Sequence, residues 1–216
     1  MDCAAIPSSN YARLRALVCR ATGPLFALVA RLRRLRTPSQ LKGYNKLHLG
    51  SGARLLQGWA NLDINGLGSL IWDLRKPLPL AKAQIRFVYT EHFIEHIERD
   101  YAVRLFSHAR KVMVPGGVLR VSTPDLVKLV DDYRAGQVVR MEHGGWFPET
   151  PCRMVNEGMR MWGHTFVYDK AELVGLLREC GFNSIQRVQW GESEHPELRN
   201  LESRPDFADL IIEARV

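Results

Sequence analysis

The chain has 216 residues, which suffice for one compact domain with a sizeable core but would be cramped for two. Hydrophobic residues make up 46% and charged residues 25%, a composition that argues against a disordered, fibrous or polytopic membrane protein. The net charge of +7 is carried by residues 1–42, which hold eight basic residues against one acid. Because the charges of residues 43–216 cancel, nucleic acid is not expected as a partner.

The N-terminal arm, residues 1–42, is expected to be basic and helical, because over residues 11–36 apolar residues recur every three or four positions and most arginines lie off that stripe. Gly23-Pro24 should divide this pattern into two short helices. Its longest uncharged stretch, Ala21 to Ala30, has ten residues, about half of the roughly 20 that a membrane-spanning helix needs. Three roles therefore stay open. The arm lies on an anionic membrane surface, packs on its own domain or on a second subunit, or is a loosely ordered tail.

The four cysteines are far apart in the sequence, with no C-x-x-C pair and no His–Cys cluster at zinc-ligand spacing. This pattern is typical of free thiols in a reducing compartment. We expect a cytoplasmic protein, with peripheral contact at the inner membrane face as one role of residues 11–36. Nothing in the sequence indicates the oligomeric state.

The domain from residue 43 to residue 216 alternates apolar strand patterns with helical ones. Strands are predicted at Lys46–Leu49, Trp59–Ile64, Ser69–Trp72, Ile85–Thr90, Val118–Thr123, Ile185–Trp190 and Ala208–Ala214. Helices are predicted from an Asp100 cap to a stop at Pro115-Gly-Gly117, over Leu126–Arg134, and from an Asp169 cap through Cys180. This order predicts an α/β, Rossmann-like doubly wound fold with a mostly parallel seven-stranded sheet and helices on both faces.

Residues 137–168 interrupt this alternation with a segment rich in Gly, Trp, Met and His and without clear periodicity. A segment of this length inside a compact domain is typical of a lid or a binding loop. We therefore expect a lid-like insertion that shapes the substrate site.

Polar residues follow the first predicted strands where a parallel sheet binds its ligands. Gly50-Ser51-Gly52 comes directly after the first strand and lets the backbone approach a nucleotide ligand closely, although the third glycine of the dinucleotide fingerprint is absent. Asp63, at the next strand end, can accept hydrogen bonds from both ribose hydroxyls, or it is a turn aspartate. Asp73 lies where the third strand ends and could receive an adenine amino group.

The sequence resembles the class I S-adenosylmethionine-dependent methyltransferases, and within them the small type-11-like group of predicted methyltransferases. The resemblance covers about residues 45–214. Its motifs are Leu47-His-Leu-Gly-Ser-Gly52, the acid Asp63, Trp72-Asp-Leu-Arg-Lys-Pro-Leu-Pro79, Tyr89-Thr-Glu-His92 with Ile94-Glu-His96, Val114-Pro-Gly-Gly-Val-Leu-Arg-Val121, and the later Trp162-Gly-His164, Tyr168-Asp169 and Gly191-Glu-Ser193.

The resemblance implies a binding site for S-adenosyl-L-methionine. The Gly50–Gly52 loop, including Ser51, would wrap the methionine part, Asp63 would hold the ribose, and Asp73-Leu74 would border the adenine. The Thr90–His92 turn would lie beside the methionine end and the substrate. The chain departs from the family at His48, where an acid is usual, and at Arg54, where the loop's third glycine is usual, so Glu91 is our candidate to hold the cofactor's ammonium.

Methyl transfer needs alignment of donor and acceptor, and removal of a proton when the acceptor is a hydroxyl or an amine. Histidine suits that task because its pKa lies near neutrality, so our catalytic candidates are His92, His96 and His164, in that order. Each has a structural alternative: His92 and His96 could satisfy backbone carbonyls, and His164 could be a loop histidine that orients Tyr168 or a backbone group. Asp125 is a weaker alternative base. His92 and His96, paired with Glu91 and Glu95, could also suggest a metal site. Their spacing lacks a third ligand, so no metal ion is predicted.

We therefore expect methyl transfer to a small molecule, a saccharide or a lipid-linked precursor. One alternative is a cofactor-binding module without turnover, anchored by its arm. Another is a nicotinamide-dependent oxidoreductase, which would share the glycine loop and the ribose acid but does not call for Asp73-Leu74 or Pro115-Gly-Gly117.

Overall fold

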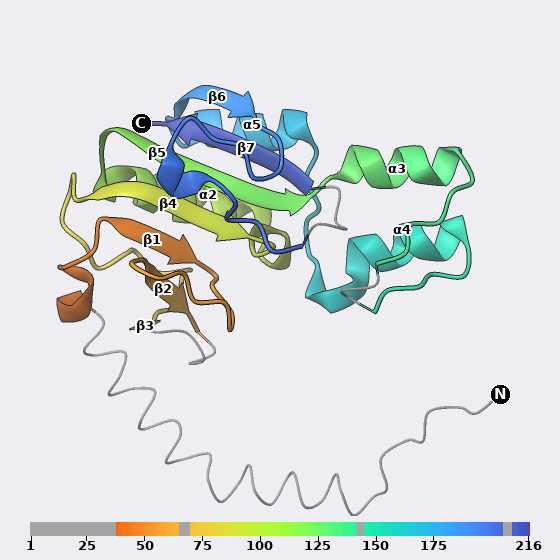
Figure 1. Ribbon diagram of the computed structural model, residues 1–216, viewed down its shortest axis with the longest axis horizontal. Helices are drawn as coiled ribbons and strands as arrows, with labels where there is room; N and C mark the ends of the chain where they lie inside the picture. The colour runs from red at the N-terminus through yellow and green to blue at the C-terminus, as the bar shows by residue number, and fades with distance from the viewer. Residues whose placement is uncertain (1–37, 65–69, 142–144, 205–208) are drawn as a thin grey trace, which may run out of the picture.

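The structure, a computed structural model, describes residues 38–64, 70–141, 145–204 and 209–216 (Figure 1). The predicted helices of residues 11–36 lie outside this range. Residues 38–41 are helical, and Leu41 is fully buried in the main core, so the end of the expected arm already packs against the domain. Among the described residues, no helix combines the length and the apolar character needed to cross a membrane.

A seven-stranded sheet in the order β3-β2-β1-β4-β5-β7-β6 forms the centre of the molecule. The strands are β1 Lys46–Leu49, β2 Ala60–Asp63, β3 Leu70–Ile71, β4 Ile85–Glu91, β5 Met113–Pro124, β6 Asn183–Arg187 and β7 Asp209–Arg215. The first five pair in parallel, and β7 runs antiparallel to both of its neighbours. The predicted Rossmann-like, mostly parallel seven-stranded sheet is confirmed.

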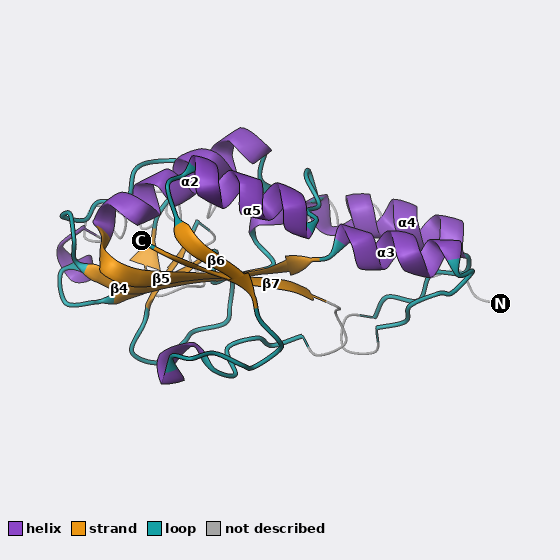
Figure 2. Cartoon of the chain, turned by 90° about the horizontal axis from the view of Figure 1, so that it is seen from above, coloured by secondary structure: helices purple, strands orange, loops and turns teal. Residues whose placement is uncertain are grey.

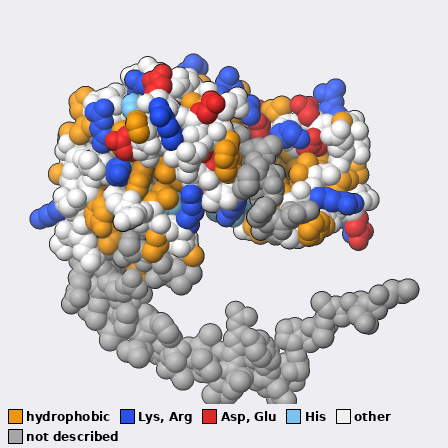
Figure 3. Space-filling model, viewed as in Figure 1, with side chains coloured by type: hydrophobic (Ala, Val, Ile, Leu, Met, Phe, Trp, Pro, Cys, Tyr) orange, Lys and Arg blue, Asp and Glu red, His pale blue; other side chains and the backbone are white. Residues whose placement is uncertain are grey.

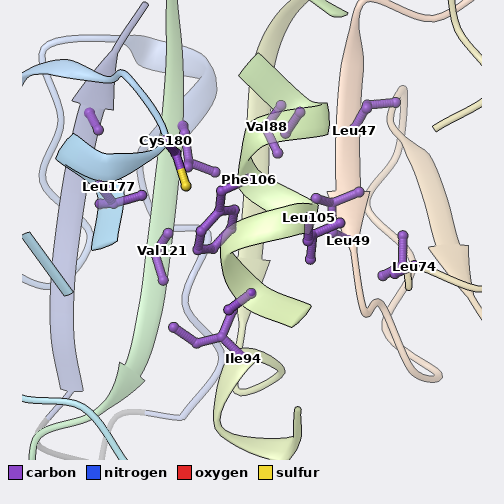
Figure 4. Packing of buried hydrophobic residues seen from close by; sticks show 14 of the residues in the cluster. Leu47, Leu49, Leu74, Val88, Ile94, Leu105, Phe106, Val121, Leu177 and Cys180 are labelled. Atoms are coloured by element: carbon purple, nitrogen blue, oxygen red, sulfur yellow. The ribbon is translucent and has the colours of Figure 1, made fainter. Parts of the chain in front are cut away.

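Two long helices, α2 (Arg99–Val112) and α5 (Lys170–Glu179), cover one face of the sheet (Figure 2). The Asp169 cap is confirmed, since its carboxylate accepts the backbone N–H of Glu172 at 2.7 Å. The Asp100 cap is wrong: Asp100 lies in the first turn of α2, one residue inside the helix start. The side chains between helices and sheet form the main core, in which Phe106 and Leu105 of α2 lie near Val121 and Val88 (Figure 4).

The opposite face is covered by residues 188–204, which we call the strap. The strap contains the 3₁₀ helix η3 (Pro196–Leu198) and packs Leu198 and Leu201 against Phe87 and Tyr89 of β4 (Figure 2). On this face the described covering is an extended segment with one short 3₁₀ helix, whereas the sequence predicted helices on both faces. A buried ion-pair group holds it: Arg120 of β5 contacts Glu202 of the strap and Glu213 of β7, each at 2.6 Å. Arg120 also donates to the Glu192 carbonyl at 2.7 Å.

Beyond the carboxyl end of β5, helices α3 (Leu126–Arg134) and α4 (Pro151–Arg160) lie side by side and form a lobe (Figure 1). Helix α4 falls inside the 137–168 insertion, for which no periodicity was expected. Thr150 caps it and Pro151 takes its first position, a start signal present in the sequence. The lobe continues into the 3₁₀ helix η2 (Met161–Gly163).

The predicted stop of α2 at Pro115-Gly-Gly117 is displaced. Helix α2 ends at Val112, and β5 begins at Met113 and runs through both glycines. The register between β4 and β5 shifts between Ile85 and Phe87, which marks a bulge. At Gly117 a Cβ would lie 3.0 Å from the Arg86 carbonyl oxygen, so this close approach of two strands requires glycine.

Candidate functional site

The loop after β1 turns back on the end of β2. The backbone N–H groups of Gly50 and Ser51 both donate to the carbonyl of Leu62, at 2.9 and 3.1 Å. Gly50 and Gly52 have positive φ angles of 68° and 55°, which glycine adopts without strain. The loop is therefore a tight glycine-dependent turn at the carboxyl edge of the sheet, as the sequence predicts.

The two glycines of this loop face different surroundings. A Cβ on Gly50 would lie 2.3 Å from the ring of Phe93, so that glycine makes room for a side chain of the protein itself. A Cβ on Gly52 would meet nothing within 4 Å. Between them, Ser51 Oγ is buried and has no hydrogen-bond partner among the residues that the structure describes. A bound ligand with polar atoms fits these features, since it would lie against Gly52 and satisfy the hydroxyl.

Two acids flank the loop, one on each side. Asp63, at the end of β2, accepts the backbone N–H of Gly52 at 2.9 Å. Glu91, at the end of β4, lies 2.8 Å from Arg54 Nη1 and accepts from the backbone N–H of Ser203 at 2.6 Å and from its hydroxyl at 2.9 Å. Because β2, β1 and β4 are neighbours, a ligand along this edge would meet Asp63 at one end and Glu91 at the other.

Asp73 and Leu74 lie one strand further out. Both carboxylate oxygens of Asp73 accept from the guanidinium of Arg75, at 2.9 and 3.0 Å. The side chain of Leu74 is buried in the main core, so only its backbone can face an adenine. The structure thus places the two residues at the expected strand end and gives Asp73 a partner that the sequence did not indicate.

His48 points away from the glycine loop. Its Nδ1 lies 3.1 Å from Asn61 Oδ1, and its ring lies 5.2 Å from the ring of Tyr89, on the face covered by the strap. Burial lowers the pKa of His48 to about 4, so the imidazole is neutral near pH 7. A buried neutral ring does not replace the acid usual at this position in the handling of a cofactor's ammonium.

The three candidate histidines gather around one buried carboxylate, that of Glu95. His92 Nδ1 lies 3.1 Å from Glu95 Oε1, and His96 Nε2 lies 4.0 Å from the same oxygen. The rings of His96 and His164 are 4.9 Å apart. One ligand atom each of Glu95, His96 and His164 lies within 4.8 Å of the others. The third potential ligand that the local spacing lacked is therefore present, 68 positions further along the chain.

The turn that carries these histidines is not a continuous α-helix. His92 has a φ of 47°, which is uncommon for a residue other than glycine, and the 3₁₀ helix η1 (Ile94–His96) begins after it. His92 and His96 therefore do not share one helical face. Burial alone would raise the pKa of Glu95, but the hydrogen bond and charge of His92 outweigh it, so the pKa lies below its usual value.

His164 follows η2 in the insertion. Its Nδ1 donates to the Gly158 carbonyl at 2.8 Å, which matches the backbone-bonding alternative expected for this residue. Burial lowers its pKa. Asp125, the weaker alternative base, caps α3 through the backbone N–H of Val127 and pairs with Arg187 at 3.0 Å, so it has a structural role.

A cavity of about 170 Å³ lies between α3 and the insertion, next to the histidines. Its apolar wall includes Leu129, Met141, Trp146 and Trp162, and His164 also lines it. The lobe around it exposes hydrophobic side chains, some of which are visible in Figure 3. Seven of the ten exposed large hydrophobic side chains among the described residues belong to this lobe: Val127, Val130, Tyr133, Phe147, Met159, Met161 and Trp162.

Solved structures with a similar fold include S-adenosylmethionine-dependent methyltransferases. One from Archaeoglobus fulgidus has a TM-score of 0.52 at 17% identity, covering 88% of this chain and 94% of that one. Another, from Mesorhizobium loti, has a TM-score of 0.50 at 18% identity, covering 82% and 92%. No family model matches the chain, and no curated protein does. The likeness establishes a Rossmann-like methyltransferase fold.

The structure thus brings together Gly50, Ser51, Gly52, Asp63 and Glu91 at one edge, and the three histidines beside them. Sequence reasoning did not assign Arg54 or Ser203 to this edge, and it used Glu95 only in a rejected metal site. Arg54 was visible as a departure from the family pattern. Ser203 gave no signal, because it reaches Glu91 from 112 positions away.

Proposed function

We propose that the chain transfers a methyl group from S-adenosyl-L-methionine to a small-molecule, saccharide or lipid-linked acceptor, as a type-11-like class I methyltransferase. The observation that carries this proposal is the glycine loop between two acids, with Asp63 bonded to Gly52 at 2.9 Å and Glu91 on the other side. An acid on the β2 side can accept hydrogen bonds from both ribose hydroxyls, and an acid on the β4 side can pair with a methionine ammonium.

When bound, S-adenosylmethionine supplies an electrophilic methyl group on a sulfonium. The chain's own residues would fix its orientation through the loop and Asp63, and would receive a proton from the acceptor. His92 is our first candidate for that proton, because it is next to Glu91 and lies 3.1 Å from the Glu95 carboxylate, which can stabilise an imidazolium. His96 and His164 remain the second and third candidates.

The acceptor would occupy the cavity between α3 and the insertion. Its aromatic and aliphatic wall suits an apolar molecule or the face of a sugar ring. The exposed hydrophobic side chains of the lobe favour an acceptor with an apolar part, such as a lipid-linked precursor. Contact of residues 11–36 with an anionic membrane is a separate proposal, which the positive charge of the arm supports.

Calorimetric titration of the full chain with S-adenosylmethionine and S-adenosylhomocysteine tests the cofactor. We expect binding of both, a loss of affinity of about tenfold to a hundredfold in Asp63→Ala, and no change in Asp131→Ala, which removes an exposed carboxylate on α3. A chain that binds NADH but does not bind S-adenosylhomocysteine would overturn the proposal in favour of an oxidoreductase. If the chain binds S-adenosylmethionine but forms no S-adenosylhomocysteine with any hydroxyl or saccharide acceptor tested, a cofactor-binding module without turnover is favoured.

A further inference from the structure

Two segments far apart in the sequence meet at the buried carboxylate of Glu95. Glu95 and His96 lie in η1, directly after β4, whereas His164 follows η2 in the insertion. The backbone carbonyl of Glu95 accepts the N–H groups of Thr165 and Phe166, at 2.7 and 3.2 Å, which fastens the two segments together. The side chains of Glu95, His96 and His164 are thereby held within reach of one another.

The hydrogen bonds of these side chains indicate which of their atoms could bind an ion. His164 Nδ1 donates to the Gly158 carbonyl at 2.8 Å, so its Nε2 carries the lone pair. Glu95 Oε2 accepts the hydroxyl of Thr123 at 3.1 Å, while Oε1 lies 4.0 Å from His96 Nε2. Hydrogen bonds of this kind, to a backbone carbonyl and to the second carboxylate oxygen, orient the ligands in metal sites.

We propose that Glu95, His96 and His164 form a binding site for one divalent transition-metal ion, with Zn²⁺ as the ion that the ligand set fits best. Two imidazoles and one carboxylate are ligands of the kind found in zinc sites with an open position, whereas Mg²⁺ and Ca²⁺ prefer oxygen ligands throughout. Ligand atoms about 2 Å from one ion lie at most about 4 Å apart. The present spread of up to 4.8 Å would therefore have to close by at least about 1 Å.

The surroundings leave room for that closure and for a further ligand. The side chain of His96 is 31% exposed, so it can rotate, while the Glu95 side chain is fully buried and fixed. His92, 3.1 Å from Glu95 Oε1, would stay beside the ligating carboxylate as an outer hydrogen-bond donor. Since His164 also lines the apolar cavity, the ion would lie at the boundary between the cavity and the cofactor edge.

Metal binding can be measured without the cofactor, so its outcome is independent of the methyltransferase proposal. The untagged full chain is stripped with a chelator, dialysed and titrated with Zn²⁺ in a calorimeter. We expect one equivalent to bind and to raise the midpoint of thermal unfolding. The variants His96→Ala and Glu95→Gln should each weaken binding at least tenfold, because each removes one of three ligands. His108→Ala, which removes a half-buried histidine of α2, should bind as the wild type does.

Co²⁺ supplies a second readout, since its visible absorption reports nitrogen and oxygen ligands in a low-coordinate site. We expect that absorption in the wild type and in His108→Ala, and its loss in His96→Ala. Far-UV circular dichroism tests whether each variant is folded. We expect His96→Ala to fold, because the His96 side chain is partly exposed. The proposal is overturned if the wild type binds no Zn²⁺, or if folded His96→Ala and Glu95→Gln bind it as tightly as His108→Ala.

Discussion

The guanidinium of Arg54 lies 2.8 Å from the carboxylate of Glu91, and this ion pair joins the glycine loop to the end of β4. The Glu91 side chain is 5% exposed and the Arg54 side chain 32%. The residue that replaces the usual third glycine thus contacts the acid that we expect to bind the cofactor's ammonium. A methionine end carries one positive and one negative charge, so the pair offers an opposite charge for each.

Replacing Glu91 by Gln should weaken S-adenosylmethionine binding by about tenfold or more, because a charge-assisted hydrogen bond to the ammonium becomes a neutral one. The affinity for 5′-methylthioadenosine, which keeps the nucleoside and lacks the amino acid, should stay unchanged. Calorimetric titration with both ligands measures the difference. Glu98→Gln, the same change at an exposed position, is the control. An equal loss for both ligands would show that Glu91 acts on the nucleoside or on the fold, and not on the ammonium.

The two glycines of the loop should respond differently to alanine. Gly50→Ala places a Cβ 2.3 Å from the Phe93 ring, in a backbone conformation that disfavours side chains, and should reduce the free energy of unfolding by about 2–4 kcal/mol. Gly52→Ala carries only the backbone strain, about 1 kcal/mol. Its methyl group would enter the open space beside the loop, so it should reduce S-adenosylhomocysteine affinity at least tenfold.

Urea unfolding and calorimetry on both variants test this contrast. A Gly52→Ala variant with wild-type affinity would mean that the cofactor does not lie against this glycine. A Gly50→Ala variant as stable as the wild type would mean that Phe93 moves aside without loss of packing.

Much of the sheet could be predicted because its signals are local. The apolar run of β1, the glycine turn after it and the Asp169 cap each lie within a few residues, and the structure has them where the sequence predicts. The contacts between side chains could not be predicted in this way. Ser203 reaches Glu91 from 112 positions away, and His164 reaches Glu95 only because the insertion folds back over η1. The strap was unexpected because extended segments with one short helix have no periodicity.

Removing the guanidinium of Arg120 should destabilise the fold strongly. Glu202 and Glu213 are 0% and 3% exposed, so Arg120→Met leaves two buried carboxylates without a cation and should reduce the free energy of unfolding by about 3–5 kcal/mol. Adding Glu202→Gln and Glu213→Gln should restore part of the loss, since neutral amides need no counter-charge. Urea unfolding of the single and triple variants measures this. A single variant within 1 kcal/mol of the wild type would mean that the ion-pair group does not hold the strap.

The buried His48 should make stability depend on pH between about 6.5 and 4. Its pKa is about 4 in the folded chain, against 6.5 as its ordinary value, because burial disfavours the charged ring. Above pH 6.5 the ring is neutral in both states and its contribution is fully present. Between pH 6.5 and 4 the unfolded chain binds a proton that the folded chain excludes. The free energy of unfolding therefore decreases as the pH is lowered, by about 3 kcal/mol in all.

His48→Asn removes this titration while keeping a side-chain N–H near Asn61, so we expect its free energy of unfolding to fall less steeply over the same interval. Urea unfolding at half-unit steps of pH gives both curves, and their difference isolates His48 because the carboxyl groups titrate in both proteins. The difference should be constant above pH 6.5 and should shift progressively in favour of the variant down to pH 4. Curves that stay parallel across this interval would mean that water or a rearrangement lets the folded chain protonate the ring.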